Sequence, residues 1–426
     1  MVTVVMRTIF IKRAAAVIAA CCLVTTLSAP QAIADPGIST TGVPLPTPVT
    51  DHCPNKSVPT PAVDESEVVA AGETTPTPLA VPNPPLGGNQ LGACGIVADP
   101  AVGPLPERLT SSGWLIADLD TGNVVAAKDP HGRYRPASTI KVLLALVVLD
   151  ELNLDTPVEA TVNDWSMEGD SCGMGPGGKY TVRDLLTGLL VVSGNDCANA
   201  LARELGGLDE TLAKMNATAA KLGARDTRAA SPSGLDSAGM STSPFDLALF
   251  FREAMGNETF RDIMALKTYT FPGYPKRVDV PGDVDHPAWT MGTSNPLLRD
   301  DWPGMLGGKT GYTDDALKTF VGAAQRNGRN VLIVQMYGLN EADNSYSEQA
   351  ARMFEYGFAA PSNATVGSLA VPGSRQASPY DDDRDFAISN DVATAWSTWL
   401  VVGLAVFAAL CLIGALVLAT IRRRQR

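Results

Sequence analysis

An uncharged apolar stretch near the C-terminus sets the topology of the whole chain. Residues 400–421 contain no charged side chain, and about 20 such residues are enough to cross the hydrocarbon core of a bilayer. Four arginines follow at once: Arg422, Arg423, Arg424 and Arg426. Basic residues next to a span stay on the cytoplasmic side. We therefore expect a transmembrane helix at 396–421, a cytoplasmic basic tail at 422–426, and everything before them outside.

The N-terminus carries an export signal. Basic residues at positions 7, 12 and 13 precede an apolar run over 14–24, and Ala32-Ile33-Ala34 has the small-x-small pattern of a cleavage site. This predicts a signal peptide at 1–34. An alternative is that residues 18–21 act as a lipoprotein cleavage box with Cys21 lipidated, but the apolar sequence continues past Cys21. The protein is expected in the cell membrane as a single-pass chain with its folded part on the extracytoplasmic side.

Charge and histidine content exclude several classes of partner. The formal net charge is −12, and the exported part is more acidic still because the leader and tail hold basic residues. Such a surface repels phosphate polymers, so we expect no nucleic-acid partner. The three histidines, His52, His131 and His286, lie far apart in the sequence. No metal-ligand spacing links them, and we expect no metal and no other cofactor.

Composition divides the exported part into three segments. Residues 35–105 are rich in proline and small residues, as in TTPTPLAVPNPPLGG at 74–88, which predicts a disordered spacer. Residues 361–395, which include the acidic run DDDRD, predict a linker to the membrane. One folded domain remains, at 106–360.

Within that domain, strand patterns lie at both ends and helix patterns between them. Two hairpins are predicted, at 113–129 with a turn at 121–123 and at 318–338 with a turn at 326–328. Helix signals cover 181–192, 196–205 and 245–255. We expect an α+β fold, an antiparallel sheet flanked by helices with an inserted helical lobe.

A serine and a lysine lie three residues apart at the start of an apolar helix pattern. Ser138 and Lys141 precede the buried-type residues 142–149, and a three-residue spacing places both side chains on one helix face. Burial disfavours the ammonium form of a lysine and lowers its pKa. A neutral amine beside a hydroxyl is a base beside a nucleophile. Alone, this spacing is weak evidence, because an ordinary helix cap followed by a lysine gives the same pattern.

Two further motifs strengthen the hypothesis. The chain contains one Ser-x-x-Lys, at Ser138, followed by one Ser-x-Asn, at Ser193-Gly194-Asn195, and one Lys-Thr-Gly, at Lys309-Thr310-Gly311. Together they resemble the serine acyl-transferases that bind penicillin. The segments at 181–207, 231–255, 294–298 and 307–316 are similar to the D-alanyl-D-alanine carboxypeptidases of the low-molecular-weight penicillin-binding group.

That resemblance implies a serine peptidase that removes the terminal D-alanine from peptidoglycan stem pentapeptides through an acyl-enzyme. It also implies that β-lactam antibiotics inhibit the protein. Ser138 would attack the peptide carbonyl, Lys141 would accept its proton, and Ser193 would relay a proton to the leaving amine.

The resemblance also assigns substrate-binding roles. Asn195 would hold the substrate backbone, Lys309 would supply positive potential, and Thr310 would meet the terminal carboxylate. The oxyanion hole would consist of the backbone N–H groups of Ser138 and of Tyr312, which follows Gly311.

The chain departs from the family in places. Many members have a second β-rich domain and an amphipathic anchor, where this chain has a linker and a predicted span. Many carry an arginine after the strand that follows the third motif, whereas residues 338–349 contain none. That departure leaves the carboxylate anchor beyond Thr310 open.

Sequence features argue against three other functions. A class A β-lactamase needs a Glu-x-x-Leu-Asn-like loop between the second and third motifs, and none occurs between Asp196 and Gly308. The central residue of the second motif is also Gly194 rather than aspartate. A non-catalytic penicillin-binding sensor needs an intracellular output domain, for which residues 422–426 are too short. A cell-wall structural protein with a decayed site would not be expected to keep all three motifs.

Four cysteines belong to the exported part, Cys53, Cys94, Cys172 and Cys197, which allows three pairings. An oxidising compartment preserves disulfides. Cys197 lies two residues after Asn195, and Cys172 lies in a glycine-rich loop that a disulfide would order. We predict Cys172–Cys197, with Cys53–Cys94 as a second bridge in the spacer.

Overall fold

The computed structural model describes residues 38–39 and 47–370. The predicted signal peptide at 1–34, the linker beyond residue 370 and the predicted span at 396–421 lie outside the described residues. Within the described part of the chain, no helix is both long and apolar enough to cross a bilayer.

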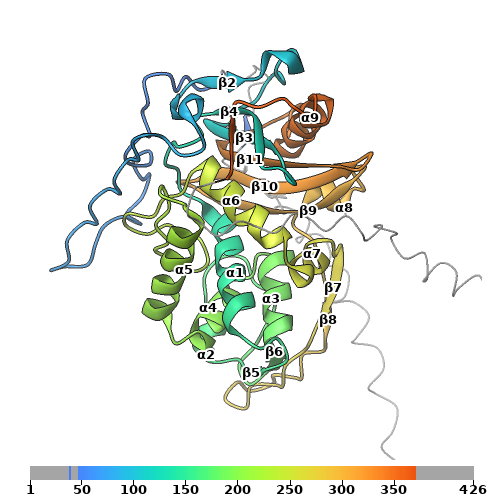
Figure 1. Ribbon diagram of the computed structural model, residues 1–426. Helices are drawn as coiled ribbons and strands as arrows, with labels where there is room; N and C mark the ends of the chain where they lie inside the picture. The colour runs from blue at the N-terminus through green and yellow to red at the C-terminus, as the bar shows by residue number, and fades with distance from the viewer. Residues whose placement is uncertain (1–37, 40–46, 371–426) are drawn as a thin grey trace, which may run out of the picture.

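A central antiparallel sheet organises the domain (Figure 1). Its strands follow the order β13-β4-β3-β11-β10-β9, and β2 also pairs with β4. Their bounds are β2 Ile96–Ala98, β3 Gly113–Asp118, β4 Asn123–Lys128, β9 Met305–Thr313, β10 Leu317–Arg326, β11 Arg329–Gly338 and β13 Gly367–Ser368. Strand β9 thus lies at one end of the sheet, and it carries the third motif.

Three small two-stranded sheets lie outside the central one. They pair β1 Ile38–Ser39 with β12 Asn340–Glu341, β5 Pro157–Glu159 with β6 Lys179–Thr181, and β7 Thr268–Phe271 with β8 Trp289–Gly292.

Helices cover both faces of the central sheet. The helical lobe and the C-terminal helix comprise α1 Lys141–Glu151, α2 Val162–Trp165, α3 Val182–Val191, α4 Asn195–Glu204, α5 Leu208–Leu222, α6 Pro244–Met255, α7 Glu258–Met264, α8 Pro296–Arg299 and α9 Tyr346–Ala359. Helix α6 packs on one face and α9 on the other, while α1, α3, α4 and α5 form the lobe below α6 (Figure 1). The result is the expected α+β arrangement, with the lobe inserted between strands β4 and β9.

Sequence-local signals explain the helix starts. Thr181 and Asp184 form a capping box at α3, and Ser243 caps α6 with Pro244 at its first position. Ser345 and Glu348 form another capping box at α9. These side chains satisfy backbone N–H groups that a helix start leaves without partners.

The predicted disordered spacer differs from the structure. Residues 47–98, which we call the strap, lie along the folded domain, drawn in blue in Figure 1. The disulfide Cys53–Cys94 closes the strap, and buried Arg133 donates to the backbone carbonyls of Ser57, Leu79 and Ala80 at 2.6–3.0 Å. A Pro-rich sequence lacks helix or strand periodicity, but buried donors can still bind its carbonyl groups and fix the backbone. The prediction of disorder from the composition of this segment was therefore wrong for residues 47–98.

The predicted domain end at residue 360 was also too early. Strand β13 pairs with β4 through Gly367 and Val124, so the folded domain continues to this strand.

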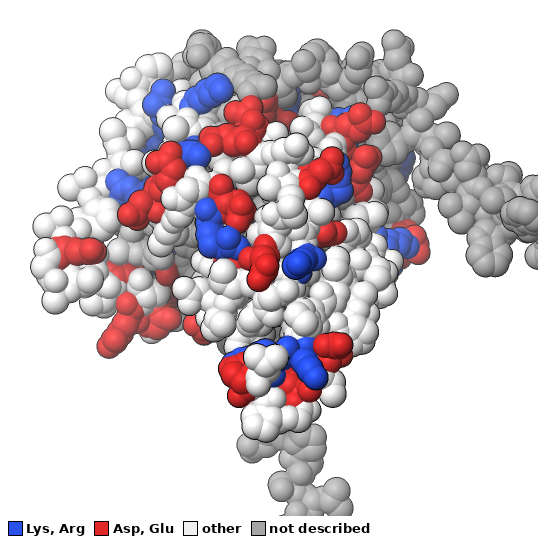
Figure 2. Space-filling model, turned by 90° about the horizontal axis from the view of Figure 1, so that it is seen from below, with Lys and Arg blue, Asp and Glu red and all other residues white. Residues whose placement is uncertain are grey.

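Surface charge is mixed on the face seen from below. Figure 2 shows basic side chains there in small groups beside acidic ones, without a broad basic area on that face.

Candidate active site

Ser138 lies in a short turn immediately before helix α1. It belongs to the 3-10 helix Ala137–Ile140, which leads directly into α1 at Lys141. Ala137 has a φ of 47°, a left-handed conformation that costs energy for a residue with a side chain. Such strain persists only where the surroundings fix it, and it is common at active sites.

The amine of Lys141 lies in the middle of the three motifs. Its side chain is fully buried, and Nζ lies 2.7 Å from Ser138 Oγ, 2.7 Å from Asn195 Oδ1 and 3.4 Å from Ser193 Oγ. Nζ also donates to the carbonyl oxygen of Ser233 at 2.6 Å. The nucleophile candidate, the base candidate and the second motif therefore meet at one amine.

Burial lowers the pKa of Lys141 well below its ordinary value, and the positive charge of Lys309 lowers it further. The carboxylates of Asp170 and Asp196 act in the opposite direction on this pKa. A lysine whose pKa is lowered in this way loses its proton more readily, and the neutral amine can accept one from Ser138.

The second motif links helices α3 and α4. Ser193 has a φ of 69°, and Asn195 begins α4. Asn195 donates through Nδ2 to the carbonyl of Glu168 at 2.7 Å and through its backbone N–H to that of Asp170 at 2.6 Å. The loop that carries Glu168 and Asp170 therefore orients Asn195 toward Lys141.

A disulfide and a carboxylate fix that loop. Cys172 is bonded to Cys197, and Asp196 accepts from the backbone N–H of Cys172 at 2.9 Å and from Ser171 Oγ at 2.6 Å. Cys172, Asp196 and Cys197 are also the one group of possible metal ligands close together among the described residues. Because the two sulfurs are joined to each other, this group offers no thiolate to a metal.

The third motif runs along strand β9. Lys309 is fully buried and donates to the carbonyl of Thr310 at 2.7 Å, while Thr310 Oγ1 donates to Ser294 Oγ at 3.1 Å. Burial lowers the pKa of Lys309 to about 8, against the opposing effect of Asp170. At neutral pH most Lys309 side chains therefore still carry a positive charge.

Strand β9 passes directly over the backbone of Ser138. A Cβ atom at Gly311 would lie 2.8 Å from the Ser138 nitrogen and 2.4 Å from Thr319 Oγ1, so only glycine permits this approach. Thr319, the partner of Gly311 on β10, donates through Oγ1 to the carbonyl of Pro136 at 2.9 Å. The Ser138 turn and the third motif are therefore held against each other.

A cavity of about 620 Å³ adjoins the third motif. Thr310, Gly311 and Tyr312 line it on one side, with Asp170 and Ser294 nearby and the basic side chains of Arg299 and Lys318 on its wall. A volume of this size fits the end of a peptide.

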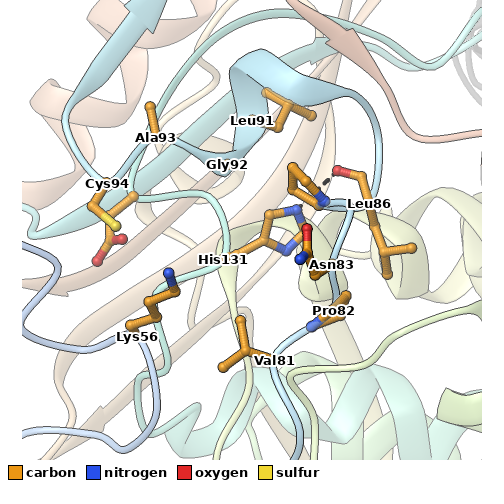
Figure 3. Close-up of a pocket in the computed structure, with 12 residues that line it drawn as sticks. Lys56, Val81, Pro82, Asn83, Leu86, Leu91, Gly92, Ala93, Cys94 and His131 are labelled. Carbon is orange, nitrogen blue, oxygen red and sulfur yellow. Dashed lines mark hydrogen bonds between the residues drawn. The ribbon is translucent and has the colours of Figure 1, made fainter.

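A second cavity, of about 390 Å³, lies between the strap and the folded domain (Figure 3). His131 projects into it, with Nε2 3.0 Å from the carbonyl oxygen of Leu86 and Nδ1 2.8 Å from Asp226 Oδ2. Both ring nitrogens of His131 have structural partners, and none of the predicted catalytic residues lines this cavity.

The structure brings together all predicted motif residues and adds groups that the motifs do not contain. Ser233 contributes a backbone carbonyl to Lys141, Ser294 partners Thr310, and Asp170 acts on the pKa of both lysines. Ser233 and Ser294 lie in segments already noted for their family resemblance. A backbone carbonyl, however, has no residue-type signature from which its role could be predicted.

This fold and site define a class, the serine acyl-transfer enzymes whose nucleophile is paired with a buried lysine. Comparisons with known proteins narrow the class. Residues 101–339 match the family model described as D-alanyl-D-alanine carboxypeptidase, and the chain belongs to that family. It is a serine-type peptidase of the D-Ala-D-Ala carboxypeptidase kind.

Among curated relatives, the D-alanyl-D-alanine carboxypeptidase DacB2 of Mycobacterium tuberculosis is 49% identical over 269 residues, covering 62% of this chain and 88% of that protein. A D-alanyl-D-alanine carboxypeptidase of a Streptomyces species is 30% identical, covering 64% of this chain and 95% of the relative.

Solved structures agree with these relatives. The crystal structure of a D-alanyl-D-alanine carboxypeptidase from Mycobacterium tuberculosis matches with 46% identity and a TM-score of 0.59, covering 64% of this chain and 99% of that one. The DD-transpeptidase of Streptomyces K15 matches with 29% identity and a TM-score of 0.54, covering 60% of this chain and all of that one.

Proposed function

We propose that Ser138 and Lys141 remove the terminal D-alanine from peptidoglycan stem pentapeptides through an acyl-enzyme. The neutral amine of Lys141 takes the hydroxyl proton, and Ser138 Oγ attacks the carbonyl carbon between the two D-alanines. The observation that carries this proposal is the 2.7 Å approach of a fully buried amine to Ser138 Oγ.

The backbone N–H groups of Ser138 and Tyr312 stabilise the oxyanion in this proposal. The close approach of Gly311 to the Ser138 nitrogen supports it, because it brings the two segments within reach of one oxygen atom. The charge on Lys309 adds positive potential beside the developing negative charge.

The leaving amine then receives the proton. Ser193 Oγ, 3.4 Å from Lys141 Nζ, relays the proton to the amine nitrogen as the C–N bond breaks and D-alanine departs. Asn195 holds the substrate backbone during this step. Water subsequently attacks the ester on Ser138, with Lys141 again accepting the proton. Lys141 then returns this proton to Ser138 Oγ as the ester bond breaks and the shortened peptide leaves.

The carboxylate of the departing D-alanine is bound by Thr310 with help from Lys318. Loop residues 338–349 offer no arginine, and Lys318 and Arg299 are basic side chains on the wall of the cavity beside Thr310. Arg299 is paired with Asp300 through two contacts of 2.8 and 3.0 Å. Lys318 lies opposite Tyr312 on the neighbouring strand, 4.3 Å from its ring centroid. We favour Lys318 as the cation that meets the carboxylate, because it lines the cavity beside Thr310 and lies opposite Tyr312 on the neighbouring strand.

The same acyl-enzyme chemistry accounts for inhibition by β-lactams. β-Lactams acylate Ser138 as substrate analogues, and the ester they leave is hydrolysed slowly.

The predicted span at 396–421, with its arginine tail, anchors the enzyme in the cytoplasmic membrane and keeps the catalytic domain outside, next to peptidoglycan.

A pentapeptide ending in D-Ala-D-Ala tests the activity, with mass spectrometry to detect the loss of one alanine. Fluorescent penicillin tests the nucleophile, because wild type should gain covalent label and Ser138→Ala should not. Labelling that persists in Ser138→Ala would overturn the assignment. A labelled wild type that leaves the pentapeptide intact would show the nucleophile to be right and the substrate wrong.

A further inference from the structure

The strap lies before the residues that match the family model and contacts the segment that leads into Ser138. The family match begins at residue 101, whereas the strap covers residues 47–98. Two strap residues, Thr60 and Glu67, contact Arg135, which lies three residues before Ser138. The contacts join the strap to the backbone segment that leads into the nucleophile.

Arg135 is held almost entirely by the strap. Its side chain is 1% exposed, and its Nε and Nη2 donate to Glu67 Oε1 at 2.9 and 2.5 Å. Its Nη1 donates to the carbonyl of Thr60 at 2.7 Å. A guanidinium buried to this degree requires a counter-charge, because an unpaired buried ion is strongly unfavourable.

The strap also holds the segment after the third motif. Asp315 lies three residues beyond Tyr312, is 1% exposed, and accepts from the backbone N–H of Val63 at 2.5 Å and from Ser66 Oγ at 2.9 Å. Its carboxylate lies 3.9 Å from Arg135 Nε. Strap residues 60–67 therefore bridge the chain just before Ser138 and the chain just after Tyr312.

Ser138 and Tyr312, whose backbone N–H groups form the proposed oxyanion hole, each lie three residues from one of these strap contacts. Donors that stabilise a transition state must be fixed in advance, and a displacement of about 1 Å can cost roughly a hundredfold in rate. On the other side, Thr319 holds the carbonyl of Pro136. The Ser138 turn thus lies between the sheet and the strap, and each side restrains it.

We propose that strap residues 60–67 are a positioning element of the active site, in which Glu67 fixes Arg135 and so the Ser138 turn against strand β9. Glu67 is a positioning residue, since it acts through Arg135. The inference rests on the proposed roles of Ser138 and Tyr312. It predicts that loss of Glu67 slows acylation while initial binding of the β-lactam is kept.

The full chain in detergent provides the test, with fluorescent penicillin as the probe. Glu67→Ala and the isosteric Glu67→Gln are compared with wild type for the acylation rate constant, the dissociation constant of the initial complex and the melting temperature. We expect acylation to slow by roughly tenfold or more in Glu67→Ala and less in Glu67→Gln, which keeps an acceptor oxygen. The dissociation constant should change by less than about twofold.

Two control variants separate positioning from stability. Glu65→Gln alters an exposed strap carboxylate two residues away and should acylate like wild type. Thr50→Val removes a buried strap hydrogen bond to the carbonyl of Cys94, and it should lower the melting temperature without slowing acylation at a temperature where the protein stays folded.

Wild-type acylation rates in both Glu67 variants would overturn the inference. So would a rate loss that follows the melting temperature in the same way for Glu67→Gln and Thr50→Val. Absence of label on Ser138 in wild type would instead refute the proposed catalytic roles, so the two failures are distinguishable.

Discussion

The buried amine of Lys141 contacts Ser138 Oγ, while the equally buried amine of Lys309 contacts a backbone carbonyl on strand β9. One lysine touches the nucleophile and the other does not. Because the two have different partners, they should respond differently to the same substitution.

Lys141→Arg should abolish acylation, because arginine stays protonated and cannot accept the proton of Ser138. Lys309→Arg keeps a cation where only potential is required, and it should retain measurable acylation, reduced by about tenfold because the larger side chain must fit a fully buried position. Acylation by fluorescent penicillin measures both, with melting temperatures as the control for folding. Equal losses would refute this division of roles.

The pH dependence of acylation should have an alkaline limb near pH 8. Lys309 has its pKa lowered to about 8 by burial, so the protonated form that supplies positive potential is present below this pH and is lost above it. On the acid side, activity should rise with pH as Lys141, whose pKa is also lowered by burial, becomes neutral. The expected profile of kcat/KM is bell-shaped.

Lys309→Arg provides the matched test of the alkaline limb. Arginine stays charged through this range, so the fall near pH 8 should disappear from the profile of this variant while the acid limb remains. An alkaline limb that persists unchanged in Lys309→Arg would assign it to another group.

Lys318→Gln should raise KM for the pentapeptide by about tenfold with little change in kcat, because a charge-assisted contact to the substrate carboxylate is lost. Arg299→Gln serves as the control and should change KM less, since Arg299 is already paired with Asp300. A pentapeptide amide, which lacks the carboxylate, should be cleaved equally by wild type and Lys318→Gln. A difference on the amide would argue against the contact.

Replacing Cys172 and Cys197 together by alanine should lower the free energy of unfolding by about 3.5 kcal/mol, on the chain-entropy relation for a bridge spanning 25 residues. Acylation should slow as well, because the loop bearing Glu168 and Asp170 orients Asn195. Urea unfolding and the acylation assay measure the two effects. Unchanged stability and rate would show that Asp196 alone holds the loop.

Much of the site could be predicted from sequence because its chemistry resides in side chains with fixed local spacing. Ser138 and Lys141 are three residues apart at a helix start, and Ser193 with Asn195 begins another helix. The third motif marks a strand. Within each motif, local structure alone places the reactive groups on one surface. The order of the three motifs along the chain then indicates the family.

What could not be predicted depends on backbone groups and distant contacts. The carbonyl of Ser233 contacts Lys141 across 92 residues, and the strap binds buried arginines through carbonyls of residues with no periodic pattern. Proline content predicts the absence of regular structure, but the strap shows that a segment without regular structure can still be fixed by hydrogen bonds to buried arginines. Irregular structure that is held by backbone carbonyls cannot be predicted from composition, because every residue type carries that group.

Strand β9 has one consequence for how a substrate is recognised. Within the described residues its single strand neighbour is β10, so the other edge of β9, beside the third motif, is not paired with a strand there. An extended peptide can add to this edge as a further strand and be held by main-chain hydrogen bonds. Recognition of this kind depends on the backbone conformation of the peptide more than on its side chains. The enzyme can then act on a stem peptide while tolerating variation in the residues whose side chains point away from the strand.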